Sequence, residues 1–486
     1  MPNHFTFIAM ANNLGIWQDI FYPRAVAVIG ASSNPFKMGH QCLLSLRDCK
    51  FPNPVYPINP QEKEILGWKV YAHLEQVPEK VDLAILSIPA SEVLAALKAC
   101  GQKGVKGTVI ITAGFREIED EAGNKLQQEM AALANQGGIK IIGPNTFGMV
   151  NNHAQLNASF TPLFSRLKPG SISVLSQSGG VAHLIAYQAI DEQVGLGKVV
   201  GLGNRCNVDF VDLLPFFAAD ESTKALILFI EGIDRPRLLW EGLNKFTRQK
   251  PIIAMKAGRN EFSGKAARSH TGSIAGRYEL YEAALKQAGA LLVNDPRELL
   301  DLAKVLSLMP TCTGKRVAVM SFQAGPGILI TDAVIGHGLE MASFTEQTQK
   351  KLTAILPPLT IRTNPIDLAF ARSEELFTEV LKAVLDDPQV DALIIFLLHH
   401  PFMDPRRIAH PLLLMKKYSP KPILVCLNSP RGLVEEEVRH LEEEGIPVFA
   451  FPEQTIKALK GLWQFTKIKK EKGEPLAAGL SWHKNS

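Results

Sequence analysis

The sequence has no paired cysteines. Its six cysteines stand singly, without C-x-x-C pairs or the spacing of zinc ligands; they are Cys42, Cys49, Cys100, Cys206, Cys312 and Cys426. Isolated cysteines are typical of free thiols in a reducing compartment. We therefore expect a cytoplasmic protein without structural disulfides, and the absence of zinc-type spacing predicts no metal site.

Two further absences narrow the class of protein. No apolar run reaches the roughly 18 to 20 residues that a membrane span requires, and the segment from Met1 to Ala11 lacks the basic n-region of a signal peptide. The 52 Lys and Arg residues barely exceed the 48 Asp and Glu residues, which leaves a net charge of +4. We expect a soluble, unprocessed chain whose main partner is neither a nucleic acid nor a membrane.

The chain is long enough for several hydrophobic cores. It has 486 residues, of which 46% are hydrophobic and 21% charged, as in soluble α/β proteins of more than one domain. Short β-branched runs alternate with amphipathic stretches early in the chain; the runs are 24–30, 55–58, 81–88, 108–112 and 139–142. This alternation predicts a doubly wound parallel sheet over residues 15–150.

Two later stretches look like copies of one another. The apolar runs 225–231, 250–256 and 288–296 of the first copy match the runs 392–398, 421–426 and 444–452 of the second. Each copy opens on a strand, a turn of small residues and a helix. We predict two related open α/β domains at 151–310 and 311–466, followed by a polar tail at 467–486.

Only the first copy carries a long loop, Gly258–Gly276, and His270 is the one histidine in it. The loop is rich in Gly, Ala and Ser, so packing does not explain its length. A neutral imidazole can attack phosphorus, and a carboxylate on its other nitrogen would fix the tautomer. Glu231, directly after the run 225–230, is the candidate for this carboxylate; the alternative is an ordinary surface histidine.

The segment Gly30–Gly39 follows the first predicted strand, where open α/β sheets bind ligands. It does not match G-x-G-x-x-G, because Ser32 and Pro35 occupy the later glycine positions, and a dinucleotide is therefore poorly supported. Ser32, Lys37 and the N-terminus of the following helix can meet the phosphates of another nucleotide-like ligand. A plain strand–helix turn remains the alternative.

A second turn, Ser176–Gly180, has the composition of a phosphate-binding loop. Gly179 and Gly180 let backbone N–H groups approach an oxyanion, and Ser178 adds a hydroxyl donor. His183 falls on the first turn of the following helix and can line a substrate pocket. Small turns of this kind also occur in α/β domains without a ligand, and that interpretation stays open.

Taken together, these motifs resemble those of the NDP-forming acyl-CoA synthetases, the superfamily of succinyl-CoA synthetase. They occur in that family's order and approximate spacing: Val26–Ser32, Ile141–Asn145, Ser176–Gly180, Gly203-Asn204 with Asp209 and Asp212, and Ser269–Gly272. Gly325–Gly327 and Asn364–Leu368 are similar to the third domain of the α subunit of ADP-forming acetate–CoA ligase. The resemblance implies a Rossmann-like CoA-binding domain followed by two flavodoxin-like domains.

The resemblance also implies roles for single residues. His270 would carry the phosphoryl group, Glu231 would steady it, and Ser178, Gly179 and Gly180 would bind phosphate. The CoA-binding set comprises Gly30, Ser32, Lys37, Asn59, Pro60, Lys63, Thr112, Ala113 and Gly114. Asn145 and His183 fall on the substrate side, and His183 stands where succinyl-CoA synthetase has a tyrosine that helps to place substrate.

The reaction implied by the family is acyl-CoA + ADP + phosphate ⇌ acid + CoA + ATP, through an acyl phosphate and a phosphohistidine. The expected substrates are coenzyme A and a small carboxylic acid or acyl-CoA. The sequence has no Walker motif and no ATP-grasp portion after Leu462. We therefore expect ADP or ATP with Mg²⁺ to bind an ATP-grasp β subunit in a hetero-oligomer.

Two alternatives belong to other classes of protein. One is a CoA-binding or acyl-CoA-binding regulatory protein that no longer completes turnover; the presence of His270 and Glu231 argues against it. The other is an NAD(P)-dependent dehydrogenase, which needs an acidic residue just after the second strand. Asn59 and Pro60 stand there, and Glu62 comes slightly later.

Overall fold

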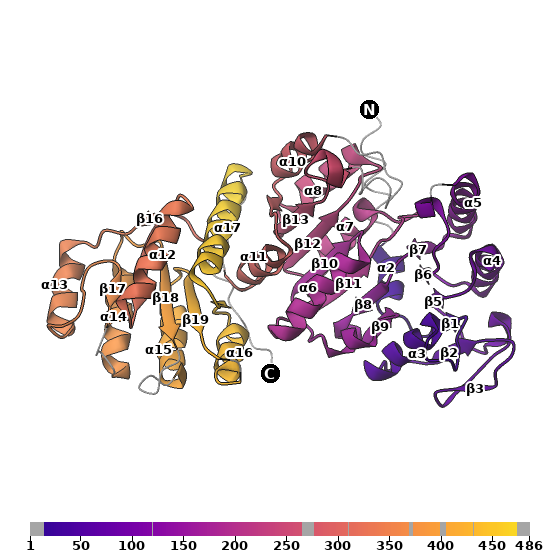
Figure 1. The fold of residues 1–486 in the computed structure, drawn as a ribbon, viewed down its shortest axis with the longest axis horizontal. Coiled ribbons are helices and arrows are strands. Elements are labelled where there is room, and N and C mark those ends of the chain that lie inside the picture. The colour runs from indigo at the N-terminus through magenta and orange to yellow at the C-terminus, as the bar shows by residue number, and fades with distance from the viewer. Residues whose placement is uncertain are drawn as a thin grey trace. The chain divides into compact units, whose positions relative to one another are not determined.

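The protein folds as an α/β chain with three large sheets (Figure 1). The computed structural model describes residues 14–118, 120–264, 277–309, 311–368, 373–398, 405–430 and 432–473. They form two compact units, Met1–Leu300 with two of the large sheets and Asp301–Ser486 with the third. The domain boundaries at 150 and 310 stay predictions.

The first sheet has five parallel strands in the order β2-β1-β5-β6-β7. Its strands are β1 (Val26–Ile29), β2 (Val55–Ile58), β5 (Leu83–Leu86), β6 (Gly107–Ile110) and β7 (Lys140–Ile142), with a separate hairpin of β3 (Glu64–Ile65) and β4 (Trp68–Lys69). Its helices are α3 (Met38–Asp48), α4 (Val93–Lys103) and α5 (Glu121–Gly137). β1, β2, β5 and β6 are buried along their whole length, as expected of apolar runs covered on both faces of a parallel sheet.

The second sheet runs in the order β14-β13-β12-β10-β11-β8-β9. Its strands are β8 (Gly148–Asn151), β9 (Leu156–Ser159), β10 (Ile172–Ser176), β11 (Leu196–Gly201), β12 (Ala225–Ile230), β13 (Ile252–Lys256) and β14 (Leu291–Leu292). Its helices are α6 (Gly179–Asp191), α7 (Phe210–Ala219), α8 (Pro236–Phe246) and α10 (Tyr278–Gln287), and α11 (Pro296–Leu308) follows. Asp209 and Asp212, both part of the family motif, form a capping box that starts α7.

The third sheet, in the second unit, runs in the order β16-β15-β18-β19-β20, with β17 beside β15. Its strands are β15 (Arg316–Ser321), β16 (Glu340–Met341), β17 (Ile366–Asp367), β18 (Ala392–Leu398), β19 (Ile423–Asn428) and β20 (Val448–Phe449). Its helices are α12 (Ala324–Gly336), α13 (Glu346–Ile355), α14 (Glu374–Asp386), α15 (Pro405–Tyr418), α16 (Glu435–Glu443) and α17 (Pro452–Glu471).

The predicted duplication is confirmed by strand order. The sequence β14-β13-β12-β10-β11 in the second sheet corresponds, element by element, to β20-β19-β18-β15-β16 in the third. In the first copy β10 lies between β11 and β12, and in the second copy β15 lies between β16 and β18, which is the flavodoxin-like arrangement. All the pairs among these strands are parallel, and their carboxyl ends therefore lie along one edge of each sheet.

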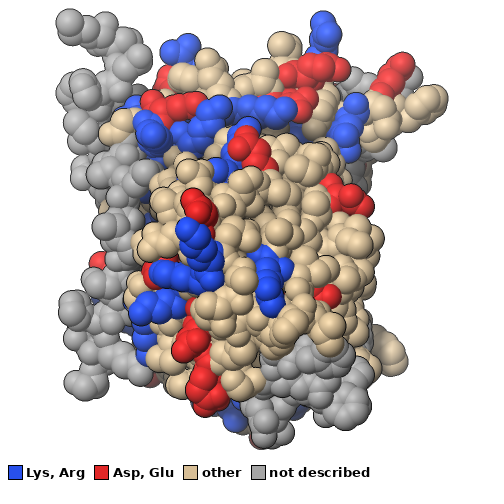
Figure 2. All heavy atoms as spheres, turned by 90° about the vertical axis from the view of Figure 1, so that its left-hand side faces the viewer, with Lys and Arg blue, Asp and Glu red and all other residues tan. Residues whose placement is uncertain are grey.

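The surface on the side of α13 and α14 carries both signs of charge, with Lys and Arg side chains lying among Asp and Glu side chains (Figure 2). On α13 itself Lys350 pairs with Glu346 at 2.6 Å. In the part of the chain that the structure describes, no helix combines the length and the apolar character needed to cross a membrane.

Helix α2 (Leu14–Phe21) joins the first two sheets into one unit. It precedes β1, yet its Phe21 ring stacks on Phe216 of α7, with ring centroids 4.7 Å apart, and meets Phe217 edge-on. The buried Asn151 side chain of β8 donates to the Phe21 carbonyl at 2.8 Å. A segment next to the first sheet is therefore anchored in the core of the second.

Replacement of this anchor should destabilise the first unit. Phe21 has no exposed surface, so we expect Phe21→Ala to lower the free energy of unfolding by about 3 to 5 kcal/mol. The measurement is urea unfolding followed by fluorescence, with Phe36→Ala as the control because Phe36 is 96% exposed. Equal stability of the two variants would contradict the anchoring role.

Candidate active site

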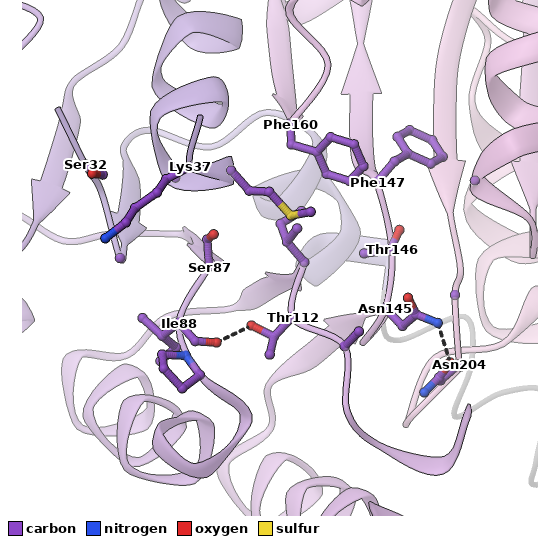
Figure 3. A pocket seen from close by; sticks show the side chains of 18 of the residues that line it. Ser32, Lys37, Ser87, Ile88, Thr112, Asn145, Thr146, Phe147, Phe160 and Asn204 are labelled. Atoms are coloured by element: carbon purple, nitrogen blue, oxygen red, sulfur yellow. Dashed lines mark hydrogen bonds between the residues drawn. The ribbon is translucent and has the colours of Figure 1, made fainter. Parts of the chain in front are cut away.

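A cavity of about 860 Å³ opens where the carboxyl ends of the first two sheets meet (Figure 3). It brings together most of the predicted site residues: Gly30, Ser32, Lys37, Asn59, Thr112, Ala113, Asn145, Ser178, Gly179, Gly180 and His183. Pro60, Lys63, Gly114 and Glu231 do not line it. Lys37 is the one lysine or arginine among its described lining residues.

The turn after β1 is built by close backbone approach. Gly30 has a φ of +86°, and a Cβ there would lie 2.2 Å from the Ser87 carbonyl oxygen. A Cβ on Gly39, in the first turn of α3, would lie 2.0 Å from the Gly30 carbonyl oxygen. The two glycines therefore let α3 begin directly against β1, with its positive N-terminal end facing the turn.

The side chains of this turn divide into buried and exposed ones. Ser32 is 5% exposed, and its carbonyl oxygen lies 2.8 Å from Nδ1 of the buried His40. Lys37, by contrast, is an exposed cation at the N-cap of α3. In Figure 3 the Ser32 and Lys37 side chains lie on one side of the cavity, across from Phe147 and Phe160.

The other predicted CoA-binding residues belong to neighbouring strand ends. Asn59 donates to the Ala31 carbonyl at 2.7 Å, and Thr112 donates to the Ile88 carbonyl at 2.7 Å (Figure 3). Gly114, with a φ of +105°, donates its N–H to Glu117. Pro60 and Lys63 are exposed beyond the end of β2. Asn59 and Thr112 therefore shape the cavity wall, whereas Lys63 lies outside it.

The turn between β10 and α6 presents a helix N-terminus to the cavity. Ser178 is the N-cap of α6, and Gly179 and Gly180 are its first residues. A Cβ on Gly180 would meet only the Ser178 hydroxyl, at 3.8 Å, so packing does not require a glycine there. Glycine at this position keeps the first N–H groups of α6 clear of side chains, as a bound oxyanion requires.

His183 is held among aromatic rings. Its ring centroid lies 4.7 Å from that of Phe164 and 5.4 Å from that of Phe147. Nδ1 lies 2.7 Å from the Gly179 carbonyl oxygen, which can only accept, so Nδ1 carries the hydrogen. Nε2 lies 2.9 Å from the Thr161 hydroxyl. Both ring nitrogens are occupied by protein, and the ring offers the cavity an aromatic wall.

Asn145 lies between the two sheets. Its φ is +55°, its N–H donates to the Thr112 carbonyl at 2.9 Å, and its side-chain amide donates to Asn204 at 3.4 Å (Figure 3). Asn204 in turn donates to Glu117 and Gln127. A chain of oriented amides therefore connects the wall of the first domain to the turn after β11.

Glu231, 8% exposed, follows β12 in a turn that is held from two sides. Its N–H and that of Gly232 donate to the Gln177 side-chain oxygen at 2.6 and 3.0 Å. Its carbonyl accepts from Lys256 Nζ at 2.9 Å. Burial lowers the pKa of Lys256 to about 8, although the nearby Glu231 acts in the opposite direction.

Residues 265–276 lie outside the described residues, and His270, the predicted nucleophile, is among them. Its role therefore stays a prediction. Sequence reasoning missed Gln177, Phe147, Phe160 and Ser87, which all line the cavity. Gln177 belongs to the Ser176–Gly180 turn, but an uncharged side chain between two serines does not by itself indicate a functional residue.

Sequence models of three known domain families match the chain in order. The CoA binding domain matches residues 24–152, the succinyl-CoA ligase like flavodoxin domain residues 169–306, and the ligase-CoA domain residues 317–469. The fold and the cavity thus define a CoA-binding protein of the succinyl-CoA ligase-like class, and the predicted fold class is confirmed.

Relatives along the whole chain identify the family. The α subunit of ADP-forming acetate–CoA ligase II of Pyrococcus furiosus is 40% identical over 453 residues, which cover 92% of this chain and 97% of the relative. The chain belongs to the family of ADP-forming acetate–CoA ligase α subunits.

Two further matches support this assignment. ADP-forming acetate–CoA ligase I of Archaeoglobus fulgidus is 36% identical over 92% of this chain, but the match covers 64% of the relative. A structure of acetyl-coenzyme A synthetase 1 of Ca. Korarchaeum cryptofilum in complex with phosphate and ADP has a TM-score of 0.84 at 33% identity, covering 93% of this chain and 97% of the other.

The buried Lys256 predicts a pH-dependent stability difference. Its folded pKa of about 8 lies below the 10.5 of a free lysine, so between these values the unfolded state binds more protons and the free energy of unfolding rises with pH. Relative to Lys256→Met, we expect the wild type to gain roughly 2 to 3 kcal/mol from about pH 7 to about pH 10. Urea unfolding at several pH values measures this gain, and a pH-independent difference between the two proteins would contradict it.

Proposed function

We propose that this chain is the CoA-binding, phosphohistidine-carrying α subunit of an ADP-forming acyl–CoA ligase of the acetate–CoA ligase type. The observation that carries the proposal is the cavity in which the turn after β1 and the α6 N-terminus meet. One wall belongs to the domain that matches CoA-binding domains, and the other presents the helix N-terminus that suits phosphate. In this proposal the thioester and the phosphate meet in this cavity.

The chemistry that we propose has three transfers. A phosphate oxygen attacks the thioester carbonyl carbon, the carbon–sulfur bond breaks, and CoA leaves as the thiolate. A ring nitrogen of His270 then attacks phosphorus of the acyl phosphate, the phosphorus–oxygen bond breaks, and the carboxylate leaves. In the last transfer a terminal phosphate oxygen of ADP attacks the phosphohistidine, which releases the imidazole and forms ATP.

The described residues have matching tasks in this scheme. Ser178, Gly179 and Gly180 bind phosphoryl oxygens, Glu231 orients and stabilises the imidazole, and His183 with Phe160 forms the apolar wall for the acyl group. Gly30, Ser32, Lys37, Asn59, Thr112 and Ala113 serve CoA. Among the described lining residues only Lys37 is cationic, which suits the phosphates of CoA.

The last transfer needs a nucleotide-binding partner, and we propose an ATP-grasp β subunit that holds ADP or ATP with Mg²⁺. The name of the P. furiosus relative includes "subunit alpha", and the A. fulgidus relative extends well beyond the matched region. A cytoplasmic location forms part of the proposal. Its support is the set of cysteines, all six of which are free thiols.

Phosphorylation of His270 is the direct test. After incubation with acetyl-CoA and phosphate, we expect the intact mass of the chain to increase by one acid-labile phosphoryl group, and His270→Ala to show no increase. The incubation is repeated with a candidate β subunit. CoA binding without phosphorylation across several acyl-CoAs, with and without that subunit, would favour the non-catalytic binding protein instead.

The close contact of Gly39 with the turn after β1 predicts that a larger residue at position 39 weakens CoA binding. A Cβ on Gly39 would overlap the Gly30 carbonyl, which is backbone and cannot turn away. Gly39→Ala should therefore displace the turn and raise the Kd for CoA by about ten- to a hundredfold. Gly101→Ala is the matched control, since a Cβ in that helix meets only Ile139 at 3.8 Å. Calorimetric titration with CoA compares them, and an unchanged Kd for Gly39→Ala would count against a CoA site at this turn.

A further inference from the structure

The geometry points to Gln177 as a phosphate-binding residue: we propose that its Nε2 donates a hydrogen bond to a phosphoryl oxygen of inorganic phosphate, and then of the acyl phosphate, at the N-terminus of α6. The inference rests on the proposed function and deepens it. Gln177 lines the cavity and directly precedes Ser178, the N-cap of that helix.

The orientation of the Gln177 amide is fixed by its neighbours. Its oxygen accepts from the N–H groups of Glu231 and Gly232, at 2.6 and 3.0 Å, and backbone N–H groups can only donate. A flipped amide would place two donors against two donors. Nε2 therefore points away from the Glu231 turn.

The Nε2 group of Gln177 is a buried hydrogen-bond donor. Gln177 is 4% exposed, and Nε2 has no hydrogen-bond partner among the described residues. A buried amide N–H without a partner is unfavourable, and a ligand bound in the cavity that Gln177 lines can supply the missing acceptor. Gly179 and Gly180, the first residues of α6, line the same cavity, and their N–H groups also suit an anion.

The same side chain connects the phosphate site to Glu231. Its oxygen holds the backbone of the turn that carries Glu231, while its nitrogen would hold the phosphoryl oxygen. Lys256 holds the opposite end of this turn through the Glu231 carbonyl. A phosphate bound at Gln177 is thereby placed at a set position relative to the carboxylate that serves the phosphorylated histidine.

The Gln177→Glu variant tests the Nε2 donor separately from the side-chain oxygen, which holds the Glu231 turn. A glutamate retains an oxygen that accepts from Glu231 and Gly232, but it replaces the Nε2 donor with a second oxygen that repels phosphate. We expect phosphohistidine formation from acetyl-CoA and phosphate to fall by about a hundredfold or more, with a raised KM for phosphate and an unchanged Kd for CoA. Lower pH should restore part of the rate, because the introduced carboxyl group again donates a hydrogen bond once it is protonated.

Two further variants make the outcome decisive. Gln347→Glu introduces the same charge at an exposed position of α13 and should leave the rate unchanged. Gln177→Met, an uncharged variant of similar size, should also lose phosphate affinity but show no recovery at low pH. If Gln177→Glu no longer binds CoA, the test of the Nε2 donor rests on Gln177→Met instead.

The results distinguish a failure of the proposed function from a failure of the Gln177 assignment alone. A wild type that forms no phosphohistidine, with or without a β subunit, overturns the proposed function and this inference together. In the second case the wild type forms phosphohistidine, and Gln177→Glu or Gln177→Met does so at a rate within threefold of the wild type and with the same KM for phosphate. This result overturns only the assignment of Gln177.

Discussion

Parallel strand pairing is the constraint on which the site depends. Ser176, the last residue of β10, pairs with Gly201 of β11 and with Phe229 of β12. The residues that follow these strands are therefore neighbours although they are far apart in sequence. Gln177 meets Glu231 and Gly232 for this reason, and no local sequence motif could bring them together.

The same constraint acts in the first sheet. Ile29 of β1 pairs with Ile58 of β2 and Leu86 of β5, so that Gly30, Asn59 and Ser87 emerge at one edge. Backbone contact then replaces side-chain packing at the turn, because Gly30 lies too close to the Ser87 carbonyl for any larger residue. In the third sheet the strand order is repeated, but Pro326 removes one donor from the corresponding helix start. The duplicated scaffold is thus retained with one N–H donor fewer at this helix start.

The sequence allowed prediction of the features that alternate or repeat. Apolar runs such as 225–230 indicated the buried strands, and the matching runs of the two copies indicated their common strand order. Glycines after strands indicated the two turns of the cavity. Gln177 and Phe160 could not be found in this way, since their roles arise from neighbours on other strands and helices. Lys63 follows the second strand of the first sheet, but it is exposed and does not line the cavity, and its role in CoA binding stays a prediction.

Helix α2 has a consequence for how a ligand enters. The stacked rings of Phe21 and Phe216 tie the segment before the first sheet to the second. Swinging the two sheets apart would bring the Phe21 ring into water, at a cost of about 1.5 to 3 kcal/mol. This cost favours the arrangement in which the two sheets stay together, so the cavity between them is already formed before a ligand arrives.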